Sequence, residues 1–254
     1  MNTIEKNQQM NRLEVKDISK VFKVKTKGKD VALSHLAHFF QDSNKKTYIQ
    51  VLDAVSFTVA PGEILGIVGK NGSGKSTLLK IMAEVYSPDS GSIVRNGEVF
   101  YLTSMGIGII EKLSMKDNIF LVGSIMGMSQ KKIRDIYNQI VDFSELGDFV
   151  DMKVCQFSKG MIGRLGFSIS VFCLQNRMTE ILLLDEVFGS GADFEFEKKA
   201  ITKMEELIQG GATVVMVSHS LPTIEKYCNR VIWLDKGKIR AVGEPKEVIS
   251  KYAA

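Results

Sequence analysis

The sequence GKNGSGKST, residues 69–77, is a glycine-rich loop between two apolar segments. ILGIV precedes it at 64–68, and LLKIMA follows it at 78–83. A short apolar run before a glycine loop and an amphipathic run after it predict a strand, a loop and a helix in succession. The loop also matches the pattern G-x-x-x-x-G-K-[ST], which binds phosphate groups at the start of a helix.

The residue types of this loop suit a phosphate ligand. Glycine lets backbone N–H groups turn towards an anion, and the helix that follows contributes partial positive charge at its N-terminus. In such loops the lysine, here Lys75, reaches the β- and γ-phosphates, and the hydroxyl of the next residue, Ser76, ligates Mg²⁺. A chance glycine turn is the alternative, and the flanking strand and helix count against it. The residues predicted to bind a nucleotide are Gly69, Asn71, Gly72, Ser73, Gly74, Lys75, Ser76 and Thr77.

Composition limits the class of protein. The 254 residues are enough for one large α/β domain or two small ones, and 44% apolar with 24% charged residues is ordinary for a globular chain. The net charge of +4 is too mild to argue for nucleic acid. Three cysteines without C-x-x-C spacing favour a reducing cytosol. The polar N-terminus shows no signal peptide, and no apolar run reaches the ~18–20 residues that cross a bilayer.

Strand and helix patterns alternate along much of the chain. A bent first strand is expected within 13–24, and alternation of Val55, Phe57 and Val59 predicts a strand at 54–59. Asn96-Gly97 predicts a two-residue hairpin turn between arms at 92–95 and 98–101. The later elements are strands at 181–184, 213–217 and 231–234 and helices at about 193–209 and 222–228. This alternation predicts an α/β fold with a mostly parallel sheet covered on both faces.

The middle of the chain, 105–175, has a helical character and is expected to form a block inserted into the sheet domain. Ser129 is the predicted cap of one helix, which places Ile133, Ile136, Ile140 and Phe143 on one side. A second helix is predicted to begin near Ser158. We therefore expect a single domain over 1–254, with a core at 11–104 and 176–254.

An insertion is expected at 25–50, between two early strands. Leu33, Leu36, Ala37 and Phe40 have the spacing of an amphipathic helix. This helix either faces the core or lies against a partner or a membrane surface.

Two further stretches place chemical groups at strand ends. Ile181–Leu184 is apolar and is followed by Asp185 and Glu186, while an apolar run at 213–217 leads to His219. Buried parallel strands deliver such residues to the carboxyl edge of the sheet, beside the phosphate loop. We expect Asp185 to hold Mg²⁺, Glu186 to orient or deprotonate water, and His219 to approach the γ-phosphate. A solvated strand end and a structural histidine are the alternatives.

A third stretch, Ser158, Lys159 and Gly160, stands at the predicted start of a helix. Alone it indicates no more than a serine cap. Because a helix N-terminus favours an anion, it is also a second surface that could contact a phosphate.

These stretches, in this order and spacing, resemble the ATP-binding cassette (ABC) ATPases over residues 13 to about 250. The resemblance implies a P-loop NTPase, RecA-like fold with an antiparallel β subdomain and an inserted α-helical signature subdomain. It also implies ATP and Mg²⁺ as cofactors, and a homodimer in which Ser158, Lys159 and Gly160 contact the nucleotide of the other copy. Phe22 is expected to stack on adenine, since family members carry an aromatic residue after the first strand; a core phenylalanine is the alternative.

A narrower resemblance is to the ABC ATPases that export polysaccharides such as O-antigen, capsule or teichoic acid. It rests on residues 142–149 with 157–161, on 185–187 with Lys198 and Lys199, and on the insertion at 25–50. It implies that two copies drive a membrane-spanning permease, which handles the glycan. The chain is then expected at the cytoplasmic face of the inner membrane, as a peripheral subunit without a nucleic-acid partner.

Three features depart from the wider family. Lys159 stands where a Gly or Ser is usual, and no Gln occurs in Thr103–Gly108, a Gly-rich form that the polysaccharide subfamily resembles. The loop 188–193 is one residue longer than in that subfamily, which bears on Asp193 as an acid at the dimer contact.

Two other classes of function are possible for a chain with a phosphate loop. A soluble ABC-type ATPase acting on nucleic acid or the ribosome usually has two cassettes or long coiled coils, and neither pattern occurs here. A GTPase or small-molecule kinase would use the phosphate loop alone. The chain has no Asn-Lys-x-Asp motif for guanine, and such an enzyme would leave Ser158 and His219 unexplained.

Overall fold

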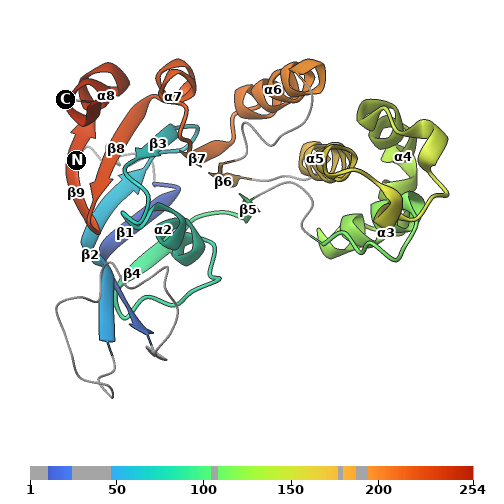
Figure 1. The fold of residues 1–254 in the computed structure, drawn as a ribbon. Coiled ribbons are helices and arrows are strands. Elements are labelled where there is room, and N and C mark those ends of the chain that lie inside the picture. Colours follow the sequence, from blue (N-terminus) through green and yellow to red (C-terminus); the bar gives the residue numbers. More distant parts are fainter. Residues whose placement is uncertain (1–10, 25–46, 104–107, 177–179, 187–193, 254) are drawn as a thin grey trace, which may run out of the picture.

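A computed structural model of the chain describes residues 11–24, 47–103, 108–176, 180–186 and 194–253 (Figure 1). The helix predicted at 33–40, most of the loop 103–108 and the loop 188–193 lie outside the described residues. The described part consists of two sheets with helices around them and a helical lobe beside them (Figure 1).

The larger sheet has six strands in the order β5-β6-β7-β3-β8-β9. Five of them are parallel, and the last pair, β8 and β9, is antiparallel. β7 lies between β6 and β3, so the carboxyl ends of these three strands are neighbours. The strands are β3 (Ile64–Val68), β5 (Val99–Thr103), β6 (Ile181–Asp185), β7 (Thr213–Val217), β8 (Arg230–Asp235) and β9 (Lys238–Gly243).

The smaller sheet is antiparallel, with the order β2-β1-β4. It contains β1 (Leu13–Val24), β2 (Thr47–Val59) and β4 (Ser90–Arg95). Helix α2 (Lys75–Met82) packs into the core that both sheets share, because four of its eight side chains are apolar and fully buried. These side chains are Leu78, Leu79, Ile81 and Met82. The phosphate loop is thereby held between the two sheets.

The central strands are buried on both faces, as their continuous apolar sequences predict. In β6, Ile181 and Leu183 face the core shared with α2, whereas Leu182 and Leu184 face a second core. Helices from the carboxyl half of the chain cover this second face. They are α6 (Phe194–Gln209), α7 (Leu221–Tyr227) and α8 (Pro245–Ala253).

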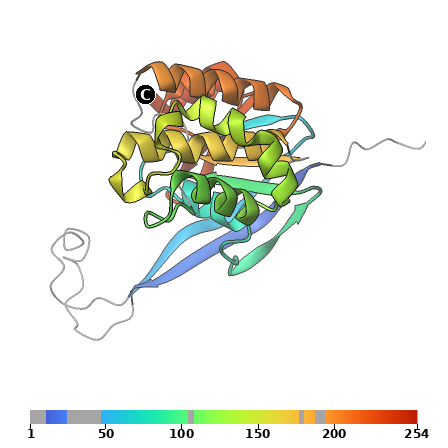
Figure 2. The same ribbon diagram turned by 90° about the vertical axis from the view of Figure 1, so that its right-hand side faces the viewer.

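The helical lobe contains α3 (Met115–Ile125), α4 (Gln130–Ser144) and α5 (Lys159–Gln175). Each of these helices begins after a serine whose side chain accepts a hydrogen bond from the first turn: Ser114, Ser129 and Ser158. Two of these caps, Ser129 and Ser158, were predicted from the sequence. Figure 2 shows the lobe from its outer side, with α6 running beside it.

The hairpin predicted at Asn96-Gly97 is wrong. β4 pairs with β1 in the antiparallel sheet, whereas β5 pairs in parallel with β6 in the other sheet. Asn96 instead anchors the crossing between sheets, since its backbone N–H donates to the Arg12 carbonyl and its side chain donates to the Asn11 carbonyl. Gly97 has φ 145°, and a Cβ there would lie 2.6 Å from the Glu180 carboxylate. Asn96-Gly97 therefore lets the chain cross from one sheet to the other close to Glu180, and it does not form a turn between paired strands.

Candidate functional site

The phosphate loop is packed so closely that two of its glycines accept no side chain. Gly74 caps α2 with φ 107°, and a Cβ there would lie 2.8 Å from the carbonyl oxygen of Val51 in β2. A Cβ on Gly69 would lie 2.1 Å from the carbonyl oxygen of Leu234 in β8. Gly72, in contrast, faces open space. The loop is thus fixed from behind by both sheets and open on the side where an anion would enter.

Lys75, the first residue of α2, has its side chain folded into this loop. Its Nζ donates to the carbonyl oxygens of Gly69 at 2.7 Å and Lys70 at 3.1 Å. Burial lowers the pKa of the Lys75 ammonium, and the charges of Glu186 and Asp185 act against that shift. A phosphate entering the loop would replace the two carbonyls with a charged partner, which makes a stronger hydrogen bond.

Ser76 and Asp185 meet at the edge of the sheet. The Ser76 hydroxyl donates to Asp185 Oδ1 at 3.1 Å, and the Tyr101 hydroxyl donates to Asp185 Oδ2 at 3.0 Å. Asp185 ends β6 and is only 7% exposed. Both oxygens of a buried carboxylate are therefore held, one from the helix after the loop and one from the neighbouring strand.

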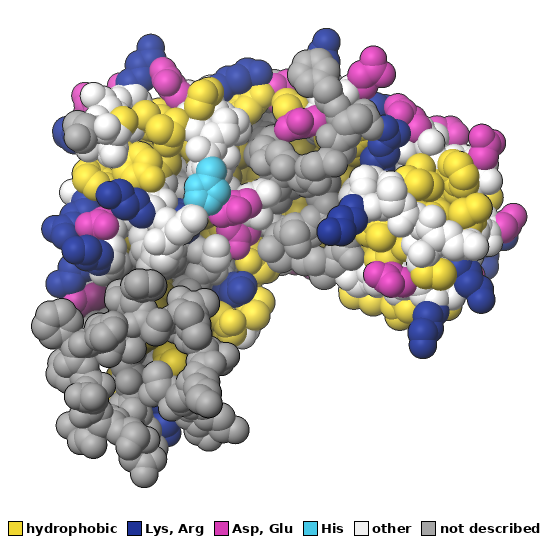
Figure 3. All heavy atoms as spheres, in the orientation of Figure 1, with side chains coloured by type: hydrophobic (Ala, Val, Ile, Leu, Met, Phe, Trp, Pro, Cys, Tyr) yellow, Lys and Arg dark blue, Asp and Glu magenta, His cyan; other side chains and the backbone are white. Residues whose placement is uncertain are grey.

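Glu186 and His219 form the next pair along this edge. His219 Nε2 lies 2.8 Å from Glu186 Oε1, and both side chains are about half exposed. Glu186 has φ 56°, and its backbone N–H donates to the Val217 carbonyl at 3.0 Å, which ties it to the neighbouring strand. Figure 3 shows histidine and acidic side chains together on the sheet part of the molecule. A carboxylate in an unusual backbone conformation beside a histidine is typical of a site for proton transfer.

The residues beside His219 fix its position. Ser218 is buried at the end of β7, and its hydroxyl accepts from the Ser220 N–H at 3.1 Å. Ser220 in turn caps α7 by accepting from the Thr223 N–H. His219 is thus an exposed residue held between a buried strand end and a capped helix.

The donor set at this edge fits Mg²⁺ with a nucleotide. Ser76 and Asp185 offer hard oxygen ligands, and Mg²⁺ commonly takes one or two protein ligands and completes its shell with water and phosphate. Among the described residues no group of three or more His, Cys, Asp or Glu gathers as an independent metal site. The buried Ser73 hydroxyl has no hydrogen-bond partner in the described part of the chain.

Phe22 lies on β1 in the antiparallel sheet and is half-buried. Its ring packs edge-on against Tyr86, with centroids 5.6 Å apart, and Lys20 Nζ lies 5.5 Å from its centroid. Lys20 is itself held in place, since its Nζ donates to Asp89 Oδ1 at 3.0 Å. Its role as an adenine platform stays a prediction.

Ser158, Lys159 and Gly160 begin α5. The Ser158 hydroxyl accepts from the Met161 N–H at 3.2 Å, and Ser158 and Lys159 are exposed. Figure 1 shows α5 in the helical lobe, on the far side of β5 and β6 from α2. The residues predicted to contact a phosphate therefore occur in two places: the loop with its carboxylates, and this separate helix start.

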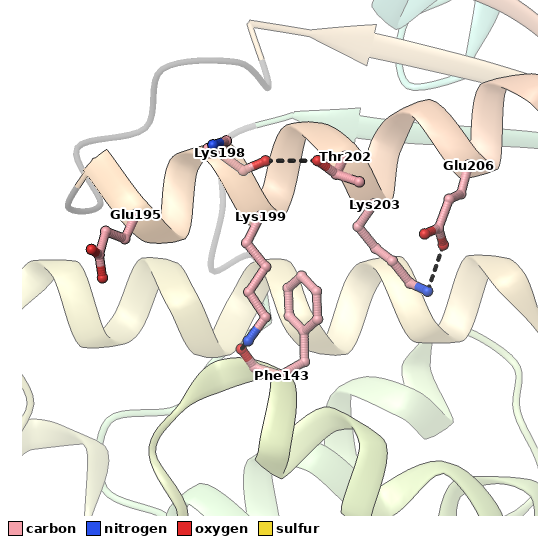
Figure 4. A pocket seen from close by; sticks show the side chains of 7 residues that line it. All are labelled: Phe143, Glu195, Lys198, Lys199, Thr202, Lys203 and Glu206. Carbon is pink, nitrogen blue, oxygen red and sulfur yellow. Dashed lines mark hydrogen bonds and ion pairs between the residues drawn. The ribbon is translucent and has the colours of Figure 1, made fainter.

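A cavity of about 420 Å³ lies elsewhere, between α6 and the end of α4 (Figure 4). Lys199 of α6 reaches across to the end of α4: its Nζ donates to the Phe143 carbonyl at 3.0 Å and to Glu145 Oε1 at 2.9 Å. Arg164 of α5 binds the other oxygen of Glu145 at 3.0 Å. The cavity is lined by Phe143, Glu195, Lys198, Lys199, Thr202, Lys203 and Glu206. Lys199 thus joins α6, the helix that follows β6 and Glu186, to the helical lobe.

Comparison with known protein families shows to which family the chain belongs. A profile of the ABC transporter family matches residues 52–189, over half of the chain, from within β2 through the phosphate loop to the residues just after Glu186. The chain belongs to the ABC transporter family. The predicted family and fold class are confirmed, since solved ABC subunits share this architecture. The ATP binding subunit of an ABC transporter aligns with TM-score 0.70 at 22% identity, over 95% of this chain and 93% of that one.

A dimeric ATP-binding cassette in a post-hydrolysis state, bound to ADP and Pi, aligns with TM-score 0.68 at 21% identity, over 92% of this chain and 98% of that one. Relatives in the ABC family are closer in sequence. The O-antigen export system ATP-binding protein RfbB of Myxococcus xanthus is 36% identical over 96% of this chain and 56% of the relative. RfbB of Klebsiella pneumoniae is 34% identical over 86% of both.

The teichoic acids export ATP-binding protein TagH of Bacillus cereus is 36% identical over 95% of this chain and 42% of the relative. This chain thus spans about half the length of two of the three relatives. Within the described residues, no helix is both long and apolar enough to span a membrane.

Sequence reasoning missed one residue of this ABC site, Tyr101. The hairpin prediction puts Tyr101 at the end of an arm, away from Asp185. The apolar, β-branched and aromatic run 99–103 could instead have been interpreted as a strand beside β6, which would have brought Tyr101 to the sheet edge.

Proposed function

We propose that this chain is the ATP-hydrolysing subunit of an ABC exporter that moves a polysaccharide or a lipid-linked glycan across the cytoplasmic membrane. The observation that carries the substrate class is its similarity, at 34–36% identity, to proteins named for O-antigen and teichoic acid export. Because two of these relatives are about twice as long as the aligned region, the complete transport activity is part of the proposal.

The geometry of the site supports ATP hydrolysis. The loop N–H groups and Lys75 would bind the phosphates, and Ser76 and Asp185 would hold Mg²⁺, which would supply positive charge beside the transferred phosphoryl group. Glu186 orients or deprotonates the attacking water, and His219, 2.8 Å away, fixes the carboxylate and reaches towards the γ-phosphate. The carboxylates and the histidine that are given these roles all lie at the carboxyl edge of the sheet, at or just after the ends of β6 and β7.

A second copy of the chain completes the site in this proposal. The phosphate loop and its carboxylates leave the outer side of a bound γ-phosphate open. The start of α5 supplies N–H groups, the Ser158 hydroxyl and the Lys159 ammonium, but it lies on the far side of β5 and β6 (Figure 1). A two-fold dimer brings each α5 start to the loop of the partner copy, because the same two surfaces meet twice.

The helical lobe carries a surface suited to a permease. Ile125 is 68% exposed, Ile110 47% and Met152 36%, so three apolar side chains face solvent on one lobe. The segments that carry them are neighbours: a Cβ on Gly108, two residues before Ile110, would lie 3.9 Å from Ile125 Cδ1, and the Met152 carbonyl accepts from the Met115 N–H. Exposed apolar side chains in such a group mark a contact with another protein.

Asn118 holds this surface in shape. Its buried side chain accepts from the Ile110 N–H at 2.7 Å and donates to the Ile110 carbonyl at 3.0 Å. The loop therefore presents Ile110 in a fixed position, as expected of a groove that receives a cytoplasmic helix of a permease. A cysteine placed at Ile110 should crosslink to such a helix. The exposed Cys155 must first be changed to serine, since it would react as well.

Export is tested in the cell that makes this chain. Deleting the gene should remove the surface glycan and accumulate its lipid-linked form inside. The wild-type gene should restore the surface glycan, whereas Glu186→Gln, produced at the same level, should not. An unchanged surface glycan after deletion contradicts the proposal. Recovery of the chain with ribosomes or nucleic acid, rather than with detergent-solubilised membranes, would favour the soluble ABC-type ATPase instead.

A further inference from the structure

Tyr101 and Asp185 come from adjacent parallel strands, yet they are not opposite each other. In the β5–β6 register Thr103 pairs with Asp185, and Tyr101 pairs with Leu183. The Tyr101 hydroxyl reaches along the sheet edge and donates to Asp185 Oδ2 at 3.0 Å. This bond is not part of the strand ladder, so the pairing of β5 with β6 does not require it.

The side of the sheet to which Tyr101 belongs is that of the phosphate loop. Tyr101 packs against the core shared with α2, whereas its neighbour Phe100 packs against the core on the other face. Ser76, in the first turn of α2, approaches Asp185 from the same side and donates to Oδ1. The carboxylate is therefore held between two hydroxyl groups that come from different elements.

We propose that Tyr101 is a positioning residue, which holds Asp185 in the orientation that receives Mg²⁺ together with the nucleotide. The inference rests on the function proposed above. When the Ser76 oxygen ligates the ion through a lone pair, its hydroxyl proton can still be donated to Asp185 Oδ1. The Tyr101 bond restrains the other oxygen, Oδ2, so the carboxylate cannot rotate away and Oδ1 stays directed to Ser76 and to the ion or its water. Groups that hold a metal ligand in this way affect metal affinity by about 10- to 100-fold.

The substitution Tyr101→Phe separates this role from packing, because it removes the hydroxyl and keeps the ring. Tyr137→Phe is the matched control: Tyr137 is half-buried in the helical lobe and stacks on Phe120, with centroids 5.9 Å apart. Each variant is titrated with a fluorescent ADP analogue at increasing free Mg²⁺ and again in EDTA. Thermal unfolding without nucleotide shows whether the fold is intact.

Tyr101→Phe should raise the Mg²⁺ concentration for half-maximal binding by about 10-fold, with affinity in EDTA unchanged. Tyr137→Phe should leave both values as in the wild type. An unchanged Mg²⁺ midpoint in Tyr101→Phe, or an equal loss of affinity with and without Mg²⁺, overturns the inference, since the phenol would then only pack. Failure of the wild type to bind the nucleotide with Mg²⁺ would instead overturn the proposed function, and this inference with it.

Discussion

His219 Nε2 and Glu186 Oε1 lie 2.8 Å apart, although 33 positions separate the two residues in the sequence (219 − 186). The pairing of β6 with β7 brings them together, because Asp185 is opposite Val217 at the carboxyl edge of the sheet. A carboxylate that acts on water must be both exposed and oriented. The histidine provides the orientation while leaving Glu186 about half exposed.

Substitutions of Lys75 and of Glu186 should impair two different steps, nucleotide binding and ATP hydrolysis. Lys75→Ala should abolish nucleotide binding, because the loop loses its cation. Glu186→Gln should retain binding and lower ATP turnover by roughly 10²- to 10⁴-fold, the usual contribution of a general base. Binding is measured with a fluorescent nucleotide and turnover by phosphate release. Wild-type turnover in Glu186→Gln would show that another group activates the water.

Ser73→Ala should stabilise the protein without nucleotide. The Ser73 hydroxyl is buried and finds no partner in the described part of the chain, and an unsatisfied buried polar group costs roughly 1–3 kcal/mol. Alanine removes the hydroxyl and fits the same space. Urea unfolding should show a gain of about 1 kcal/mol over the wild type. A loss of stability would mean that the hydroxyl is in fact hydrogen-bonded, for example through water.

Lys199→Ala should loosen the joint between α6 and the helical lobe. The Lys199 ammonium contacts the Phe143 carbonyl, the Phe143 ring and Glu145 (Figure 4). Because the side chain is 37% exposed, its loss should cost about 1 kcal/mol of unfolding free energy. Lys198→Ala, at an exposed neighbouring position, should stay within about 0.5 kcal/mol of the wild type. Equal effects of both variants would contradict this assignment.

The Glu145 ion pairs should make stability depend on pH in the acid range. Lys199, through its hydrogen bond, is the largest cause that lowers the pKa of the Glu145 carboxyl. A lowered folded-state pKa adds stability above the unfolded value of about 4.3, and that stability is lost as the pH falls through the folded-state value. The gap in unfolding free energy between the wild type and Glu145→Gln should thus be full at pH 7 and shrink below about pH 4.

Glu195→Gln provides the control for this pH series, since Glu195 is exposed on the same cavity. The gap between this variant and the wild type should stay nearly constant over the same range. A Glu145→Gln gap that does not change with pH would show that the ion pairs contribute no stability.

The sequence predicts the parallel strands and the residues at their ends well, for a physical reason. An apolar run of five residues buried on both faces stands out, and the polar residue that follows it must lie at a sheet edge. Asp185 and His219 were found in this way. Contacts between distant elements were not: Lys199 and Glu145 are joined by tertiary packing that no local pattern encodes.

The local turn preference of Asn96-Gly97 also led to one wrong prediction, a hairpin, and this prediction hid a contact of the site. Asn96-Gly97 fits a hairpin turn, but Gly97 is used for its positive φ and its close approach to Glu180. Pairing of β5 with β6 across the sheet outweighed the local turn preference. The hairpin assignment placed Tyr101 away from the sheet edge, and its contact with Asp185 was therefore missed.

The shared nucleotide site is tested most directly by mixing two inactive variants, both in the slow Glu186→Gln background. Lys75→Ala removes the loop half of the site, and Ser158→Arg blocks the α5 half. Neither variant alone should form a dimer with ATP, as measured by light scattering after size-exclusion chromatography. The mixture should form ATP-dependent dimers, because one site is then built from two intact halves. A mixture that stays monomeric with ATP, while the Glu186→Gln parent dimerises, would contradict a site shared between two copies.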